Sequence, residues 1–282
     1  MPSARAAARA IGGGLPADHL TRQVLASDLV LICTKDDAIA AVAAELGELG
    51  GTEWRGKVVL HTSGAIDSSI LRPLADVGAA TGSIHPMQTF ARQNMPELSG
   101  RVFGIEGSSA ALRAARKITR QLDGVAVRLS GSDKAAYHAA GLFACSHVLA
   151  LVEAGTRLLM AQGFTRRQAM RALLSLSRQM LDNFERMGPR AAWTGPMPRG
   201  DYSTVERHAR ALAKFPPEYL EAYSAVSRLS AVVLSGDTQS ALAGLEAALR
   251  AADGDGKSPR RAAKKRAGKP AVQGKIGATR NP

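Results

Sequence analysis

Two short polar segments combine histidine with hydroxyl residues at points where apolar runs end. They are residues 61–65 (HTSGA) and residues 83–90 (SIHPMQTF). Imidazole groups exchange protons near neutral pH, so this combination is typical of proton-transfer sites. Residues 57–60 and 77–84 have the pattern of buried strands, which places both segments at strand carboxyl ends, where open α/β sheets bind ligands. We therefore predict a functional site at this end of a sheet.

Candidates for catalysis come from these two segments and from a predicted helix after residue 131. The two strand-end imidazoles could lie side by side if their strands are neighbours, with a serine hydroxyl beside them. On the helix, a lysine, a histidine and a serine lie on neighbouring parts of one face, which could close over the strand ends. The candidate catalytic residues are His61, Ser63, His85, Lys134, His138 and Ser146.

Each of these residues also has a structural interpretation, and the sequence leaves both open. A lone imidazole is more often a hydrogen-bonded structural group, and Ser63 could act only as a helix cap. Lys134 and His138 could form an exposed first helical turn. A serine at the place of Ser146 more often bonds a backbone carbonyl than reacts. The burial and the partners of each side chain distinguish the two interpretations.

An anionic ligand is expected where residues 33–37 (CTKDD) follow a buried strand and begin a helix. Backbone N–H groups would face the ligand, Lys35 would add charge toward a phosphate, and Asp37 would cap the helix. The plainer alternative is a capped turn without a ligand. In residues 61–65, glycine lets a flat ring approach the backbone, which suits the nicotinamide end of a cofactor. The candidate cofactor-binding residues are Cys33, Thr34, Lys35, Asp37, Thr62, Ser63 and Gly64.

The histidine and cysteine residues give no metal or disulfide pattern. There is no HExxH motif, and the carboxylates lie away from the histidine pairs, so we predict no metal site. Two cysteines, Cys33 and Cys145, cannot build a disulfide framework, which favours a reducing cytoplasm. The start of the chain lacks the apolar core of a signal peptide, and no run approaches the length needed to cross a bilayer. We therefore expect no membrane partner.

The positive charge is concentrated at the C-terminus. Residues 256–282 carry nine of the net +13 charges and no acid, which leaves +4 for the preceding residues. Such a segment has almost nothing to bury, so we predict a disordered basic tail. A solvated tail is the favoured interpretation, and weak nucleic-acid binding through it is the alternative.

Strand and helix patterns alternate in the first half of the chain, and helix patterns fill the second. Predicted strands cover residues 29–34, 57–63, 77–84, 101–106 and 125–130, and predicted helices 3–11, 37–49, 67–76 and 109–122. This alternation indicates an α/β domain with a parallel sheet. Further helices are predicted over residues 132–162, 165–187, 202–214, 217–234 and 238–252. The predicted domains are residues 1–130 (α/β) and 131–253 (all-α), with the tail at 254–282.

Four motifs occur in the order of one known family. They are HTSGA, SIHPMQTF, residues 133–140 (DKAAYHAA) and residues 195–201 (GPMPRGD) followed by TVERH. In these motifs the chain resembles the Rossmann-like family with a C-terminal helical domain of unknown function, related to pyrroline-5-carboxylate reductase, deazaflavin-dependent NADP reductase and 6-phosphogluconate dehydrogenase. The resemblance implies an NADP-binding domain, a 6-phosphogluconate-dehydrogenase-like helical domain that often builds a homodimer, and oxidoreductase activity.

The resemblance also implies roles for particular residues. Thr34 and Lys35 would lie along the cofactor, residues 62–64 near its nicotinamide ring, and His61, His85 and His138 around the substrate. Ser146 stands where relatives tend to have asparagine. Relatives begin with a strand, a GxGxxG turn and a helix, whereas this chain begins about where their second strand ends. Residues 12–14 (GGG) cannot replace that turn, because they follow a helix-like segment, so we expect an N-terminally truncated Rossmann-like sheet.

The function predicted from the sequence is an NADP-dependent oxidoreductase that transfers a hydride to or from a small C=O or C=N substrate, which could be anionic. Because the phosphate-binding turn is missing, activity of this chain is a hypothesis. The first alternative is a non-catalytic dimeric scaffold or ligand sensor of the same fold. The second is weak nucleic-acid binding through the tail. The expected location is the cytoplasm.

Overall fold

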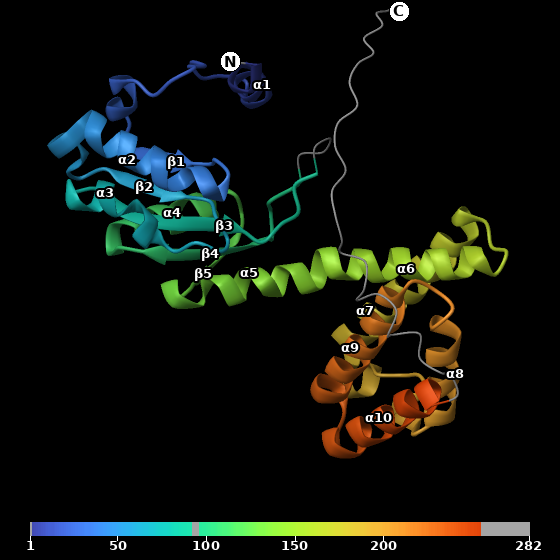
Figure 1. The fold of residues 1–282 in the computed structure, drawn as a ribbon. Helices are drawn as coiled ribbons and strands as arrows, with labels where there is room; N and C mark the ends of the chain where they lie inside the picture. Colours follow the sequence, from blue (N-terminus) through green and yellow to red (C-terminus); the bar gives the residue numbers. More distant parts are fainter. Residues whose placement is uncertain (1, 92–95, 255–282) are drawn as a thin grey trace, which may run out of the picture. The chain divides into compact units, whose positions relative to one another are not determined.

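The chain folds into two compact units, 1–151 and 152–282. The structure is a computed structural model that describes residues 2–91 and 96–254 (Figure 1). The predicted basic tail, through which nucleic-acid binding was the alternative, therefore lies outside the described residues, apart from Gly254. The first unit holds the sheet and the second holds helices. The division between the units falls inside a helix. The sequence instead predicts a domain boundary at residue 131, before that helix begins, and this predicted boundary stays a prediction.

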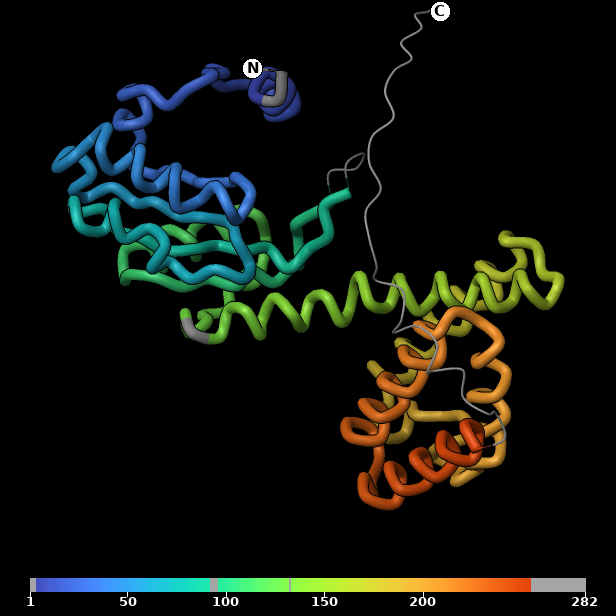
Figure 2. The backbone as a smooth tube through the Cα atoms, viewed as in Figure 1, coloured from blue at the N-terminus to red at the C-terminus, as the bar shows by residue number. Residues whose placement is uncertain are grey.

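Five strands form one sheet in the order β1-β2-β3-β4-β5. Figure 2 shows the colours from blue to green crossing the sheet in sequence order. The strands are β1 (Leu29–Ile32), β2 (Val58–His61), β3 (Ala80–Pro86), β4 (Val102–Gly107) and β5 (Val125–Arg128). All five predicted strands are confirmed within a few residues at each end.

One pair of strands departs from the predicted parallel sheet. β3 and β4 are antiparallel, whereas β1 with β2, β2 with β3 and β4 with β5 are parallel. A parallel neighbour needs a crossover connection, usually a helix, that returns the chain to the same end of the sheet. No helix is described between β3 and β4, so the chain turns back beside β3. The expectation of a wholly parallel sheet is wrong at this pair.

Helices cover both faces of the sheet. Successive residues of a strand point to opposite faces, and β2 shows this with two buried neighbours. Val59 packs in a cluster with residues of α2 (Ile39–Gly50) and α3 (Arg72–Asp76). Leu60 packs in a second cluster with residues of α4 (Ser109–Gln121). This three-layer packing fixes the carboxyl ends of β1, β2 and β3, which carry the predicted site.

The first and last parts of the described chain are helical. α1 (Pro2–Ile11) precedes the sheet, and after β5 the helices are α5 (Lys134–Leu142), α6 (Val148–Ala161), α7 (Arg166–Ala192), α8 (Tyr202–Leu212), α9 (Pro217–Leu234) and α10 (Thr238–Gly254). A π-helical turn, Phe143–His147, joins α5 to α6, so the single helix predicted over 132–162 is a continuous helical path with a widened turn. α7 bends where Gly188 adopts a φ of 77° before Pro189.

The helical path Lys134–Ala161 leaves its apolar residues uncovered. Leu149 is 70% exposed and Phe143 is 56% exposed. By length and composition the path could cross a membrane, because an 18-residue window has a mean hydropathy of 1.5 and none of it is buried. The expectation that no run is long enough did not include this helix. It counted unbroken apolar runs, whereas the alanines of this path raise the mean hydropathy between its polar residues.

Candidate functional site

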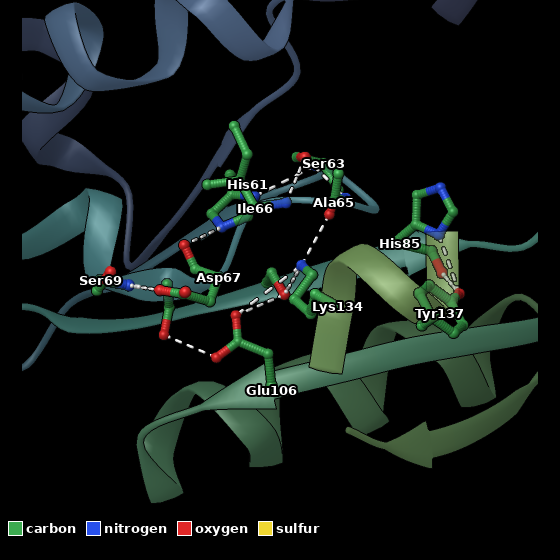
Figure 3. Close-up of polar contacts among 12 residues, drawn as sticks. His61, Ser63, Ala65, Ile66, Asp67, Ser69, His85, Glu106, Lys134 and Tyr137 are labelled. Carbon is green, nitrogen blue, oxygen red and sulfur yellow. Dashed lines mark hydrogen bonds and ion pairs between the residues drawn. The ribbon is translucent and has the colours of Figure 1, made fainter. Parts of the chain in front are cut away.

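A buried lysine connects the start of α5 to the carboxyl ends of β2 and β3 (Figure 3). Lys134 is 1% exposed, and its Nζ donates to the Ser63 carbonyl oxygen at 2.8 Å and to Ser83 Oγ at 2.6 Å. Glu106 Oε1 lies 3.9 Å from the same Nζ and accepts a hydrogen bond from Ser83 Oγ at 2.8 Å. We call Ser63, Ser68, Ser83, Glu106 and Lys134 the Lys134 network.

The Lys134 network pairs its charges and polar groups completely. Ser68 Oγ donates to Glu106 Oε2 at 2.8 Å, so both carboxylate oxygens are occupied. Burial lowers the pKa of Lys134 to about 8, and the charge of Glu106 opposes that shift. A lysine with these partners holds the Ser63 turn to the sheet. The structure thus places Lys134 as a buried positioning group, not as the exposed helical turn that was the alternative.

His61 ends β2 on the same face as Val59 and is fully covered by protein. Its Nδ1 accepts a hydrogen bond from the Ser63 backbone N–H at 3.2 Å, and its Nε2 lies 3.3 Å from the Asp67 carbonyl oxygen. Desolvation and then the charge of Lys134 lower the pKa of His61 to about 4, so the ring is neutral near pH 7. Both nitrogens bond the backbone, which is the structural interpretation of this residue.

Ser63 is a capping group in the turn after β2. Its Oγ accepts from the backbone N–H groups of Ala65 at 3.2 Å and Ile66 at 3.1 Å, and donates to Asp36 Oδ2 at 2.9 Å. Asp67 caps the next short helix by accepting from the Ser69 N–H at 2.8 Å. The Ser63 hydroxyl therefore uses its proton and its acceptor sites to fix the turn that contains Gly64.

Two imidazoles meet at Gly64. His85 and His138 have their ring centroids 5.8 Å apart in an edge-to-face arrangement. A Cβ added to Gly64 would lie 2.7 Å from His85 Nε2 and 2.8 Å from His138 Cδ2, so only glycine allows both rings this close to the turn. The structure brings these predicted residues together from β2, β3 and α5. It does not bring His61 to them, and Figure 3 shows the His61 ring toward Asp67 while His85 lies beside Tyr137.

His85 is held by Tyr137, which lies on the same helix as His138. Tyr137 Oη lies 2.9 Å from His85 Nδ1, and the two rings form an edge-to-face contact at 5.5 Å. Desolvation lowers the pKa of His85 to about 4, and the neighbouring His138 and Lys134 add to the shift. Burial raises the pKa of Tyr137. We call Gly64, His85, Tyr137 and His138 the His85 cluster.

The predicted anion-binding segment lies at the carboxyl end of β1. Thr34, Lys35 and Asp37 are exposed, and a short helical turn, Asp36–Ala38, precedes α2. Asp37 does not occupy the cap position of this turn. The N-cap residue is Lys35, and no side chain makes a capping hydrogen bond there. Burial of the thiol raises the pKa of Cys33, although the residue as a whole is exposed, and a hydrogen bond with Thr62 opposes the rise. The segment stays open to a ligand without showing one.

Ser146 lies apart from both groups of residues. It belongs to the π-helical turn Phe143–His147, is exposed, and has no contact with the His85 cluster among the described residues. Residues 2–91 and 96–254 contain no group of three or more His, Cys, Asp or Glu residues that could hold a metal ion.

Glu106, Tyr137 and Gly104 were not among the site residues predicted from the sequence. Glu106 is an acid inside an otherwise apolar buried strand, which is a signal for a paired charge. Tyr137 directly precedes His138 but lies on a different part of the helix, so helix spacing from His138 could not find it. A Cβ at Gly104 would lie 2.8 Å from the Tyr137 hydroxyl, and only the register of β3 with β4 reveals that closeness.

Two family descriptions match the chain. A Rossmann-like domain matches residues 5–86, and the family described as "Domain of unknown function (DUF2520)" matches residues 101–230. The chain joins a Rossmann-like domain to a DUF2520 domain. The DUF2520 match begins at β4, so this domain contributes Glu106, Tyr137 and His138 to the site, while the Rossmann-like match contributes Gly64 and His85. No curated protein matches the sequence.

Solved structures share this fold. Protein TM1727 from Thermotoga maritima is 24% identical, covers 87% of each chain and has a TM-score of 0.63. A candidate NADP oxidoreductase from Bacteroides fragilis, BF3122, is 23% identical over 81% of this chain and 84% of its own, with a TM-score of 0.63. A pyrroline-5-carboxylate reductase from Coxiella burnetii is 13% identical over 92% and 86%, with a TM-score of 0.51. The chain therefore shares the fold of these proteins.

Proposed function

We propose that this protein is an NADP-dependent oxidoreductase that transfers a hydride to or from a small C=O or C=N compound. The observation that carries the proposal is the meeting of Gly64, His85 and His138 at the carboxyl ends of β2 and β3. Open α/β sheets bind their ligands at this edge. The names of two proteins of the same fold, an NADP oxidoreductase and a pyrroline-5-carboxylate reductase, agree with this reaction class.

The residues at the strand ends fit the nicotinamide end of the cofactor. Gly64 has no side chain to obstruct a flat ring, and exposed Thr34 and Lys35 offer a hydroxyl and a cation at the end of β1. Thr62 and the Ser63 backbone would complete the holding residues. At this place the cofactor would supply the hydride for the substrate carbon. No strand–glycine turn–helix unit stands before β1 in residues 2–28, so the fit concerns the nicotinamide end.

The chain's own residues would bind and orient the substrate and supply a proton. His85 and His138 would contact the carbonyl or imine group, and His138 would pass on the proton that balances the added hydride, because the neutral His85 ring can donate a hydrogen bond but not a proton. Lys134 donates hydrogen bonds to the Ser63 carbonyl oxygen and Ser83 Oγ, and its charge is paired with Glu106 at 3.9 Å. A small anionic substrate would therefore need another cation, such as exposed Lys35 at the end of β1.

The proposal is tested by titrating the purified protein with NADPH and NADH and following the reduced nicotinamide fluorescence. We expect NADPH to bind and Gly64→Ala to weaken binding or turnover by at least about tenfold, because the new Cβ would displace both imidazoles. Gly236→Ala is the matched control, since a Cβ there meets nothing within 4 Å. Absence of binding by either dinucleotide at millimolar concentration would exclude the cofactor.

A non-catalytic ligand-binding protein of the same fold is the second candidate. It is favoured by the complete pairing of His61, Ser63 and Lys134, which leaves these residues only structural roles. Binding of NADPH with no oxidation in the presence of a panel of ketones, imines and keto acids would select this candidate. Steady turnover of any member would reject it.

We also propose that the uncovered apolar helices pair with a second copy of the chain. Leu149 of α6, Leu176 of α7 and Val233 of α9 are each more than half exposed. A bilayer suits the Lys134–Ala161 path less well, because Lys134 is buried in the first unit and Glu153 is charged. The 14 residues between His138 and Glu153 span only about 21 Å as a helix, against the ~30 Å of a hydrocarbon core.

Light scattering on the detergent-free protein tests this pairing. We expect the mass of a dimer for the wild type and of a monomer for Leu149→Glu, with Leu122→Glu on the first unit as control. Extraction only by detergent would favour the membrane instead.

Two free cysteines agree with a reducing cytoplasm as the location. Retention on heparin that disappears on deletion of residues 256–282 would support nucleic-acid binding by the tail.

A further inference from the structure

The Tyr137 hydroxyl has two acceptors within reach, both on His85. It lies 2.9 Å from the ring nitrogen Nδ1 and 3.4 Å from the carbonyl oxygen of the same residue. A phenol has one proton to donate, and a hydrogen bond at 2.9 Å is of normal length while 3.4 Å is at the limit. The distances therefore favour donation to Nδ1. A ring nitrogen that accepts a hydrogen bond carries no proton of its own.

We propose that Tyr137 fixes the neutral His85 ring with its proton on Nε2, so that His85 donates this N–H to the carbonyl or imine group of the substrate. This assignment rests on the proposed function, since it names the role of His85 in the same site. Which nitrogen of an imidazole is protonated is set by the hydrogen bond that the other nitrogen makes. Tyr137 is a positioning residue, because it contacts His85 and not the substrate.

The free nitrogen of His85 is the one that faces the site. Nε2 is the His85 atom nearest to the position of a Gly64 Cβ, at 2.7 Å. It has no hydrogen-bond partner within residues 2–91 and 96–254, whereas both nitrogens of His61 are occupied. The ring is neutral near pH 7, since desolvation lowers the pKa of His85 to about 4. A neutral imidazole with a free N–H can donate one hydrogen bond to an oxygen or nitrogen atom.

The fold makes room for this pairing at a specific place. Gly104 of β4 lies opposite His85 of β3 in the antiparallel register. A Cβ at Gly104 would lie 2.8 Å from both Cζ and Oη of Tyr137, so a side chain there would push the phenol away. Because Tyr137 and His138 follow each other on α5, the same helix brings both side chains to His85.

Nitrogen NMR of the histidine-labelled protein tests the tautomer directly. In the wild type at pH 7, we expect His85 to show a protonated Nε2 and an unprotonated Nδ1. Tyr137→Phe should change this distribution. Tyr223→Phe is a matched control, since Tyr223 Oη lies 3.1 Å from His208 Nδ1 in a similar edge-to-face pair, and it should leave the His85 signals unchanged. A protonated Nδ1 on His85 in the wild type would overturn the proposal.

Steady-state kinetics tests the donated hydrogen bond. We expect Tyr137→Phe to lower kcat/KM by about tenfold, as loss of one oriented hydrogen bond does, with NADPH affinity unchanged. His85→Gln keeps an N–H donor near the place of Nε2 and should retain at least about tenfold more activity than His85→Ala. Equal activity of these two His85 variants would also overturn the proposal.

The proposed oxidoreductase function and the proposed role of Tyr137 can fail separately. If NADPH does not bind and no substrate turns over while His85 keeps its Nε2 proton, the proposed function is wrong, and with it the donation to substrate, while the tautomer assignment stands. If turnover occurs but the wild-type ring is protonated on Nδ1, the oxidoreductase function stands and the role of Tyr137 is rejected.

Discussion

The Lys134 network and the His85 cluster lie at the same end of the sheet but differ in how their polar groups are paired. In the network, the lysine, the glutamate and their serines occupy one another. In the cluster, His85 has one paired and one free nitrogen among the described residues. Buried polar groups that are fully paired stabilise a structure, whereas a free group beside an open backbone can bind a ligand. This difference separates the scaffold from the candidate reaction centre.

Replacing Lys134 gives the largest effect expected from this comparison. Lys134→Met leaves the buried Glu106 carboxylate without a cation and the Ser63 carbonyl without its donor, so the free energy of unfolding should fall by about 3–5 kcal/mol. Urea denaturation measures the change. Lys117→Met, at an exposed position of α4, is the control and should stay within about 0.5 kcal/mol of the wild type.

A second substitution shows whether the loss comes from the unpaired charge. Glu106→Gln in the Lys134→Met background removes that charge, so the double variant should be more stable than the sum of the two single changes predicts. Additive losses would mean that the network is held by packing alone, and the contrast between the network and the cluster would lose its basis.

Lowering the pH should destabilise the folded protein through its two histidines of lowered pKa, His61 and His85, and not through ordinary exposed ones. The pKa of His61 is about 4 in the folded protein and near 6.5 when unfolded, so the unfolded chain binds its proton first as the pH falls. Stability is therefore present above pH 6.5 and is lost between pH 6.5 and pH 4. For one fully buried ring the loss is roughly 3 kcal/mol by linkage.

The variant His61→Asn measures this contribution. It should be less stable than the wild type at pH 7, because it lacks the buried ring, but the difference between the two proteins should narrow by roughly 3 kcal/mol on going to pH 4. Urea titrations at several pH values give both numbers. Ser108→Ala, which removes the N-cap of α4 and no titrating group, should keep a constant difference from the wild type. A constant difference for His61→Asn would show that the ring is not held neutral.

The sequence predicts the strands of this fold better than their directions. Apolar runs and turn residues locate β1 to β5 within a few residues, because short β-branched and apolar runs bounded by turn residues leave a local signal. The direction of β4 depends on whether residues 87–101 cross over the sheet, and no local pattern records that. The π-helical turn Phe143–His147 was missed for a related reason, since one extra residue in a turn hardly alters the apolar spacing.

The site was predicted in part. Gly64 and His85 were found because they follow apolar runs at strand ends, and His138 because its helix spacing places it on one face with Lys134. His61 was expected beside His85, but its ring bonds the Ser63 N–H and the Asp67 carbonyl oxygen instead, and its register partner on β3 is Ser83, two residues before His85. Tyr137 and Glu106 become meaningful only through the β3–β4 register and the start of α5, which are contacts between distant parts of the chain.

The smallest expected effect is that of Ser63→Ala, which tests whether Ser63 caps the turn or takes part in the chemistry. Ser63→Ala removes the acceptor for two backbone N–H groups and the partner of Asp36, so the free energy of unfolding should fall by about 1–2 kcal/mol. Ser108→Ala removes a weaker cap far from the His85 cluster, with one acceptor contact at 3.4 Å, and should cost no more than Ser63→Ala. If Ser63→Ala loses this stability and keeps kcat within about tenfold, Ser63 acts by fixing the turn that holds Gly64. A loss of kcat above about 1000-fold with unchanged stability would instead place the Ser63 hydroxyl in the chemistry, because a nucleophile or acid contributes on that scale.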